Sequence, residues 1–334
     1  MKISFIAEND WANVLTEYSY CLNKHSKNIE AKSICLNKHP FNYSNQHDYD
    51  LSDCTYDQGL EAQKFIFESD IIIFGEEGAI QPTNYKVLEI YKQILGLDLL
   101  NSDKKLLIWH PGTHYRQNFS FYNNHPQRNK IFKHLYAIDL YRLSPKNDND
   151  FPLFPYQYSN FNYDKYILDF KNKIKLKPWS ILHIPSNSSI KGTKIFEESI
   201  SKLKLDPKKY TYKVFENISF SQVLKEKEKS LFYLDQVNIN GGYGLASLEA
   251  IFLSNLTFSS SHYILDSIEK LTGKTELPFI SLDVDPQKLQ TTLKEFLLDT
   301  DEDKLISIME KFGKWIEKYN SPKGILKHFN NLIK

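Results

Sequence analysis

Glu249 is the one Asp, Glu, Lys or Arg side chain in a long stretch of the second half of the chain. No other such residue lies between Asp235 and Asp266, and the glycine-rich segment 240–244 precedes it. In a helix that begins near Gly244, Glu249 projects among leucine side chains, where a carboxylate is costly unless it has a partner. Glycine-rich loops before helix N-termini favour phosphate, so we expect a bound diphosphate here, with Glu249 accepting hydrogen bonds from sugar hydroxyls. The alternative is a glycine turn before a core helix with one solvated glutamate.

Lys191 and nearby glycines are candidates for contacts with the same diphosphate. Lys191 follows a predicted strand and precedes a helix, where its charge would neutralise a diphosphate leaving group. Gly242 and Gly244 would let backbone amides approach the phosphates closely, and Tyr243 would stack or hydrogen-bond beside them. The alternatives are an exposed lysine, ordinary turn glycines and one unremarkable member of a set of 21 tyrosines.

Two further candidates lie at the ends of predicted strands. Asp235 and Gln236 end a strand in the second half and would shape the donor site, or Asp235 would cap the following loop. His110 ends a strand in the first half, where the alternative is a structural histidine. The spacing of His110 and His114 resembles a helical zinc pair, but Pro111 and Gly112 between them argue against a helix, so we expect no metal.

Polar residues also follow strands of the first half. They lie after the first strand, after the strand at 70–74 and after His110. An exposed acidic loop is the alternative for Glu76, and a surface arginine is the alternative for Arg116. We assign these residues to an acceptor site: Asn9, Asp10, Trp11, Glu76 and Arg116.

Composition restricts the class of protein. A chain of 334 residues is long enough for two domains, and 41% hydrophobic with 25% charged residues is typical of a globular protein. The net charge of +1 indicates no general affinity for nucleic acid. Three scattered cysteines and no apolar run of about 20 residues favour the cytoplasm. The basic segments 171–177 and 202–209 are expected to be solvated, with peripheral contact to the inner face of a membrane as the alternative.

Strand-like and helix-like segments alternate, which predicts an α/β fold with parallel sheets. Because this pattern is interrupted at 144–177 and then restarts, we expect two Rossmann-like domains that face a cleft, with ligands beyond the carboxyl ends of the strands. The predicted domains are 1–165, 166–315 and a C-terminal helical segment 316–334 that packs back on the first. The predicted strands are 2–7, 29–36, 70–74, 105–110, 137–142, 179–185, 211–215, 231–234, 256–259 and 278–282. The predicted helices are 10–23, 57–69, 84–95, 130–136, 193–203, 219–229, 244–253, 262–271, 285–298 and 301–334, the last broken near 320–322.

Four motifs in shared order resemble those of GT-B glycosyltransferases. Residues 183–187 (HIPSN) and 190–193 (IKGT) resemble the segment that opens their second domain. Residues 234–236 (LDQ), 242–244 (GYG) and 248–250 (LEA) are similar to their donor-site signature. Residues 315–322 (WIEKYNSP) resemble their C-terminal helix break, and 110–116 (HPGTHYR) a segment of their first domain. The set is similar to glycosyltransferase family four.

The resemblance implies a retaining glycosyltransferase that needs no metal or other cofactor. Its donor would be a nucleoside diphosphate sugar, such as a UDP or GDP sugar, and its acceptor a glycan, a lipid-linked sugar or a protein. Glu249 would bind the nucleotide ribose, His110 would lie over the donor sugar, and Ser186 and Asn187 would join the donor site. His110, Lys191 and Glu249 would be the catalytic residues.

Two departures from the family pattern leave alternatives open. Gly241 stands where many members have a second glutamate, and Ser188 where many have an arginine. These departures favour a catalytically silent GT-B subunit that binds a sugar or scaffolds a glycan-assembly complex. An epimerase or a phosphorylase of the same fold is a further alternative. The sequence does not show the additional acid–base carboxylates that an epimerase needs. It also does not show the lysine context that binds pyridoxal phosphate in a phosphorylase.

Overall fold

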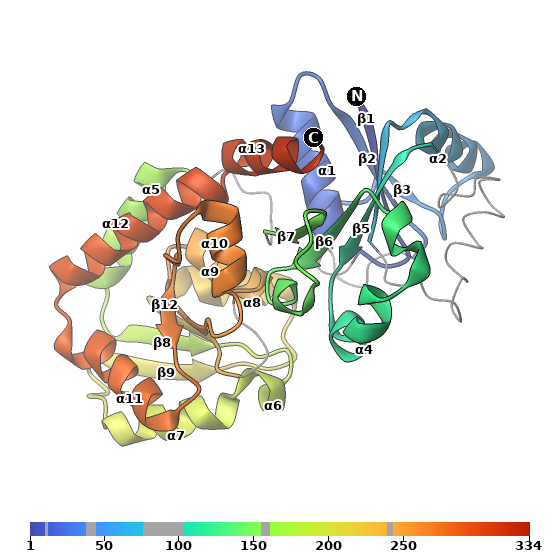
Figure 1. Ribbon diagram of the computed structural model, residues 1–334. Helices are drawn as coiled ribbons and strands as arrows, with labels where there is room; N and C mark the ends of the chain where they lie inside the picture. The colour runs from blue at the N-terminus through green and yellow to red at the C-terminus, as the bar shows by residue number, and fades with distance from the viewer. Residues whose placement is uncertain (11–12, 38–44, 76–102, 155–160, 239–242) are drawn as a thin grey trace. The chain divides into compact units, whose positions relative to one another are not determined.

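The computed structural model describes residues 1–10, 13–37, 45–75, 103–154, 161–238 and 243–334 (Figure 1). The chain divides into two compact units. The first contains Met1–Tyr158 and Ile325–Lys334, and the second contains Ser159–Gly324. The divisions therefore fall at 158/159 and 324/325, whereas we expected them at 165/166 and 315/316.

The first unit is built on a seven-stranded parallel sheet with the order β3-β2-β1-β4-β5-β6-β7. Parallel strands are covered on both faces and therefore read as continuous apolar runs, such as the fully buried Ile71–Phe74. The strands are β1 (Lys2–Ala7), β2 (Glu30–Cys35), β3 (Tyr49–Asp50), β4 (Ile71–Phe74), β5 (Lys105–His110), β6 (Lys133–Ala137) and β7 (Asp150–Leu153).

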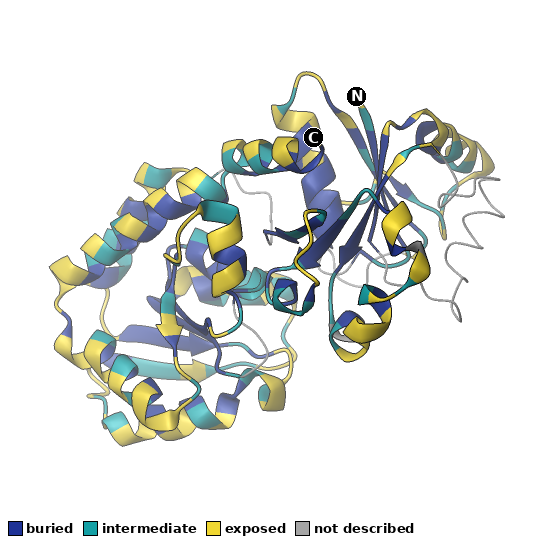
Figure 2. Ribbon diagram, viewed as in Figure 1, coloured by how far each residue is buried: buried dark blue, intermediate teal, exposed yellow. Residues whose placement is uncertain are grey.

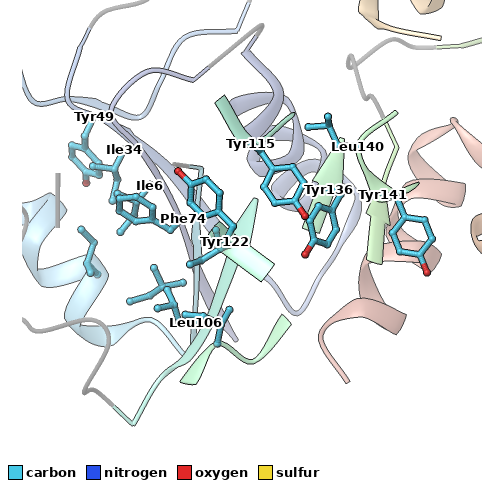
Figure 3. Packing of buried hydrophobic residues seen from close by; sticks show 14 of the residues in the cluster. Ile6, Ile34, Tyr49, Phe74, Leu106, Tyr115, Tyr122, Tyr136, Leu140 and Tyr141 are labelled. Atoms are coloured by element: carbon cyan, nitrogen blue, oxygen red, sulfur yellow. The ribbon is translucent and has the colours of Figure 1, made fainter. Parts of the chain in front are cut away.

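Helices and aromatic side chains cover this sheet. The helical elements are α1 (Val14–His25), α2 (Tyr56–Glu68), α4 (Thr113–Asn123), the short 3-10 helices η4 (Pro126–Lys130) and η5 (Tyr141–Leu143), and α13 (Pro322–Leu332). A capping box between Thr55 and Gln58 begins α2. In the core cluster of Figure 3, Tyr115 of α4 packs 5.2 Å from Tyr136 of β6, measured between ring centres.

The second unit is built on a five-stranded parallel sheet with the order β12-β11-β10-β8-β9. The strands are β8 (Trp179–His183), β9 (Tyr210–Val214), β10 (Phe232–Gln236), β11 (Leu256–Ser260) and β12 (Ile280–Leu282). Its helices are α5 (Tyr163–Lys175), α6 (Ser188–Lys191), α7 (Thr193–Leu203), α8 (Phe220–Lys229), α9 (Leu245–Phe252), α10 (Leu265–Thr272), α11 (Pro286–Lys294), the π-helical turn η6 (Glu295–Asp299) and α12 (Glu302–Tyr319). Figure 2 shows buried strands and helices with exposed outer faces in each unit.

The predicted α/β class with two parallel sheets is confirmed. Side-chain oxygens of Ser219, Asp285 and Asp301 accept backbone N–H groups at the starts of α8, α11 and α12, as expected of N-cap residues. The predicted break near 320–322 is also confirmed, since α12 ends at Tyr319 and α13 begins with Pro322. No helix of the described residues is long and apolar enough to cross a membrane.

Four predictions up to residue 177 were wrong. The expected helix 130–136 and strand 137–142 are instead the strand β6 and a turn that leads into η5, because β6 pairs with both β5 and β7. The expected connection 144–177 contains β7 and α5; β7 is an edge strand, where Pro152 is tolerated. Helix α1 begins at Val14, not at Asp10. The helix predicted at 84–95 lies outside the described residues.

The C-terminal helix α13 is anchored to the first unit by Phe329, which is 1% exposed. Its ring centre lies 6.1 Å from that of Phe5 and 6.3 Å from that of Tyr18.

Phe329→Ala removes these contacts and leaves a cavity, so we expect it to lower the free energy of unfolding by about 3–5 kcal/mol in urea denaturation. The matched control is Phe67→Ala on α2, where the ring is 43% exposed and the loss should stay below about 1 kcal/mol. Equal losses would contradict the anchoring role.

Candidate functional site

The carboxyl ends of β8 and β10 form the candidate site of the second unit. From β8 the chain goes to β9 on one side, and from β10 it goes to β11 on the other. The two strands are hydrogen-bonded neighbours, so the connections that leave them diverge at this edge of the sheet. In open α/β sheets, ligands bind at such a switch point.

Lys191, Asp235 and Gln236 meet at this edge. The Lys191 ammonium donates to Asp235 Oδ1 at 3.1 Å and to Gln236 Oε1 at 2.7 Å. The Asp235 carboxylate is 1% exposed, and its Oδ2 accepts from the hydroxyls of Ser247 at 2.6 Å and Ser259 at 3.2 Å. Burial alone would raise the pKa of Asp235, but the charge of Lys191 and the Ser247 hydrogen bond outweigh it and lower that pKa. The structure thus brings Lys191 to Asp235 and Gln236, which the sequence placed together at the end of one strand.

His183 holds the backbone around this group. Its Nδ1 lies 2.7 Å from the Leu234 carbonyl, and its Nε2 lies 2.9 Å from the Thr193 hydroxyl. Because a carbonyl only accepts, Nδ1 carries the proton in the neutral ring, and Nε2 accepts from Thr193. Burial lowers the pKa of His183, which favours this neutral form. His183 therefore joins β8, β10 and the start of α7.

Gly192 allows the Lys191 turn to lie against the segment after β10. Its φ is +77°, and a Cβ there would meet the carbonyl oxygen of Val237 at 2.5 Å. The Val237 N–H in turn donates to the Lys191 carbonyl at 3.1 Å. A side chain at position 192 would therefore displace Lys191 from Asp235.

Ser186 and Asn187 lie between β8 and α6, and both are exposed. The Asn187 side-chain oxygen caps α6, since it accepts from the backbone N–H groups of Ser189 and Ile190. Donor binding by Ser186 and Asn187 stays a prediction.

Glu249, the isolated carboxylate of α9, has a partner from α8. The Lys227 ammonium donates to its Oε2 at 2.6 Å. The Glu249 side chain is 10% exposed and that of Lys227 is 1% exposed. This ion pair offsets the cost of the carboxylate in an apolar helix. At 10% exposure, Glu249 is not the solvated residue of the alternative.

The glycine-rich segment before α9 is described only from Tyr243 onward. The side chain of Tyr243 is fully buried: its hydroxyl donates to Asn320 Oδ1 at 2.9 Å and its ring stacks on Phe279. The Tyr243 ring therefore points into the core of the second unit, and its contact with the donor stays a prediction. Gly244 is the N-cap of α9, and a Cβ there would meet no atom within 4 Å. Gly242 lies outside the described residues.

The described residues of the proposed acceptor site lie in the first unit: Asn9 and Asp10 follow β1, and Arg116 lies in α4 after β5. Asp10 is 1% exposed, and its two oxygens accept from the N–H groups of Leu15 and Thr16 at 2.9 and 2.8 Å. Burial raises the pKa of Asp10 to about 6, although these N–H groups oppose the rise. Asp10 thus supports the first turn of α1, whose N-cap residue is Asn13.

The other residues assigned to the acceptor site have partners within the first unit or are not described. Asn9 Oδ1 accepts from the Asn37 amide at 3.3 Å, and Arg116 pairs with Asp139 at 2.5 Å. Trp11 and Glu76 lie outside the described residues. Acceptor binding by these residues and by Asp10 stays a prediction.

His110 lies in a buried cluster rather than at an open strand end. It is 0% exposed, and its Nε2 lies 3.2 Å from Nδ1 of His134. His134 Nε2 faces the Arg128 carbonyl at 3.4 Å and therefore carries the proton, so His134 Nδ1 accepts from His110 Nε2–H. The one N–H of neutral His110 is thus used within the protein. A contact with a sugar would require a rearrangement, and the catalytic role stays a prediction.

Known structures share this architecture, although sequence comparisons find nothing. No protein-family model matches the chain, and no curated protein matches it. An α-glucosyltransferase in complex with UDP-glucose and DNA containing an abasic site has a TM-score of 0.65 at 10% identity, covering 100% of this chain and 99% of that chain. The chain has the GT-B fold. The fold predicted from the motifs is therefore confirmed.

Two further GT-B structures match over the whole chain. A sucrose-phosphate synthase from Thermosynechococcus elongatus has a TM-score of 0.57 at 10% identity, covering 100% of this chain and 98% of that chain. The Anabaena protein HepE in complex with UDP and glucose has a TM-score of 0.55 at 11% identity, covering 100% and 99%. At these identities the likeness concerns the fold.

Several residues that build the candidate site were not singled out in the sequence. Ser247 and Ser259 lie in apolar segments and carry no motif of their own. Lys227 belongs to a lysine- and glutamate-rich helix that predicts a solvated face. For His183 and Thr193, the signal was their position in the motifs at 183–187 and 190–193. Among the described residues, no three His, Cys, Asp or Glu side chains are grouped so as to hold a metal ion.

The buried histidine pair predicts a loss of stability in acid. Burial and the charge of Arg128 lower the pKa of His134 to about 3, against 6.5 when unfolded. The unfolded state then binds the proton more tightly, so this stability is present above pH 6.5 and is lost as the pH falls toward 3. Between pH 7.5 and 5 we expect His134 alone to lower the free energy of unfolding by about 2 kcal/mol.

The measurement is urea denaturation at the two pH values for the wild type and for His134→Gln, which cannot titrate. The difference between the two pH values should shrink by about 2 kcal/mol in His134→Gln. The exposed His262→Gln is the control and should keep the wild-type difference. An unchanged difference in His134→Gln would show that His134 does not resist protonation.

Proposed function

We propose that this protein is a glycosyltransferase that moves a sugar from a nucleoside diphosphate sugar onto a glycan, a lipid-linked sugar or a protein. The observation that carries the proposal is the group of Lys191, Asp235 and Gln236 at the switch point between β8 and β10. The group places a preoriented cation where open α/β sheets bind nucleotides. The UDP ligands of two structures with this fold favour a UDP sugar as the donor.

In this proposal, the charge that develops on the diphosphate leaving group is stabilised by Lys191. Asp235 and Gln236 hold the ammonium in place, so little reorganisation is needed when the glycosidic bond to the phosphate breaks. Backbone N–H groups at the start of α9, behind Gly244, add a favourable dipole for phosphate. Glu249 accepts hydrogen bonds from the ribose hydroxyls. Attack from the face of departure, with retention and without a metal ion, is part of the proposal.

The test is a thermal-shift panel of UDP, GDP, CDP, ADP and TDP without added metal. We expect one diphosphate, UDP, to raise the melting temperature by about 5–10 °C at a hundredfold excess over its dissociation constant. Glu249→Ala and Lys191→Met should each remove most of this shift, since a charged hydrogen bond contributes about 1.5–3 kcal/mol. The matched control Lys194→Met changes an exposed lysine three residues away and should keep the shift.

Binding and turnover then separate the proposal from its alternative. A flat panel, confirmed by calorimetry, would remove the donor site and favour a sugar-binding scaffold subunit. Binding of the diphosphate without hydrolysis or transfer of the corresponding donor sugar would indicate a catalytically silent subunit. Release of the nucleoside diphosphate from the donor sugar would exclude that alternative.

A further inference from the structure

Lys227 is a fully buried lysine whose ammonium is held on several sides. Lysine is rarely buried unless it is paired. Its Nζ donates to Glu249 Oε2 at 2.6 Å and to the Ala246 carbonyl at 3.0 Å, and it lies 4.8 Å from the ring centre of Tyr233. A cation over a tyrosine ring is attracted by the ring face. These contacts fix the position of the ammonium relative to α9.

The backbone of Lys227 is fixed as well. Its carbonyl accepts from the side-chain amide of Asn255 at 2.9 Å and from Lys173 Nζ at 3.3 Å. Asn255 is 1% exposed and also donates to the carbonyl of Ser230, which follows α8. Both ends of the Lys227 side chain are therefore anchored, and the side chain acts as a strut between α8 and α9.

This strut leaves one oxygen of Glu249 for a ligand. Within the described part of the chain, Lys227 is the residue that hydrogen-bonds the carboxylate, and it uses Oε2. The 10% exposure of the Glu249 side chain means that the carboxylate is close to the surface of the second unit. A glutamate otherwise loses considerable rotamer freedom when it binds a ligand, and prior pairing with a fixed cation removes part of that cost.

We propose that Lys227 is a positioning residue that orients Glu249 Oε1 toward the ribose hydroxyls of the nucleotide and so makes the site discriminate ribonucleotides from dideoxyribonucleotides. The inference rests on the proposed function, because it takes Glu249 as the acceptor of those hydroxyls. A site built around a hydroxyl rejects the analogue that lacks it, since its polar group is then left unpaired. If Lys227 only joined α8 to α9, its loss would weaken the binding of both nucleotides together.

The test compares the affinities of UDP and 2′,3′-dideoxy-UDP by calorimetry, with the GDP pair in parallel. We expect wild type to bind the ribonucleotide at least about tenfold more tightly. In Lys227→Met this ratio should fall to about threefold or less through weaker ribonucleotide binding, while the dideoxy affinity stays within about twofold. Glu249→Gln should also lower the ratio of ribonucleotide affinity to dideoxyribonucleotide affinity. Lys229→Met, an exposed lysine of the same helix that pairs with Glu226, is the matched control and should keep the wild-type ratio.

The outcomes separate this inference from the proposed function. If wild type binds none of the five diphosphates of the thermal-shift panel, the proposed function fails and the inference with it. If wild type binds them but does not discriminate, or if Lys227→Met keeps the ratio, the inference is overturned while the donor site stands. If Lys227→Met does not fold, Lys227→Gln decides: its shorter neutral side chain should lower the ratio, and a wild-type ratio would overturn the inference.

Discussion

The buried carboxylate of Asp235 is the constraint on which the candidate site depends. A charge at the end of a central strand is costly unless cations and hydrogen-bond donors surround it. Lys191 supplies the cation, and Ser247 and Ser259 supply hydroxyls from α9 and β11. Meeting this one requirement ties three neighbouring segments to the end of β10. The same contacts hold the Lys191 ammonium at the switch point between β8 and β10, where we propose that the diphosphate binds.

A second ion pair, between α8 and α9, compensates another carboxylate in an apolar environment. Glu249 lies in an apolar helix, and Lys227 reaches it from α8. The two pairs differ in exposure: the side chain of Lys191 is 18% exposed, whereas that of Lys227 is 1% exposed. The first cation is therefore accessible to a ligand, and the second can act only through its partner. This difference supports a phosphate-binding role for one lysine and a positioning role for the other.

Local signals predicted most elements of the second unit. The apolar runs of its parallel strands and the capping residues Ser219, Asp285 and Asp301 act over a few residues and can be read directly. In the first unit, β6 was mistaken for a helix because its strand character comes from pairing with β5 and β7. Strand β7 was missed since Pro152 is acceptable only at a sheet edge, and edges are defined by topology.

The sequence by itself determined the fold class and the five strands of the second unit, because apolar runs are local properties. Motif spacing is local too, and it identified Lys191, Asp235, Gln236 and Glu249 as site candidates. Only the tertiary structure decided their partners. The pairing of Lys227 with Glu249 spans 22 residues and that of Lys191 with Asp235 spans 44, and such contacts arise when separate elements pack. The tertiary structure likewise decided that Tyr243 and His110 point into cores, since burial depends on what covers a residue.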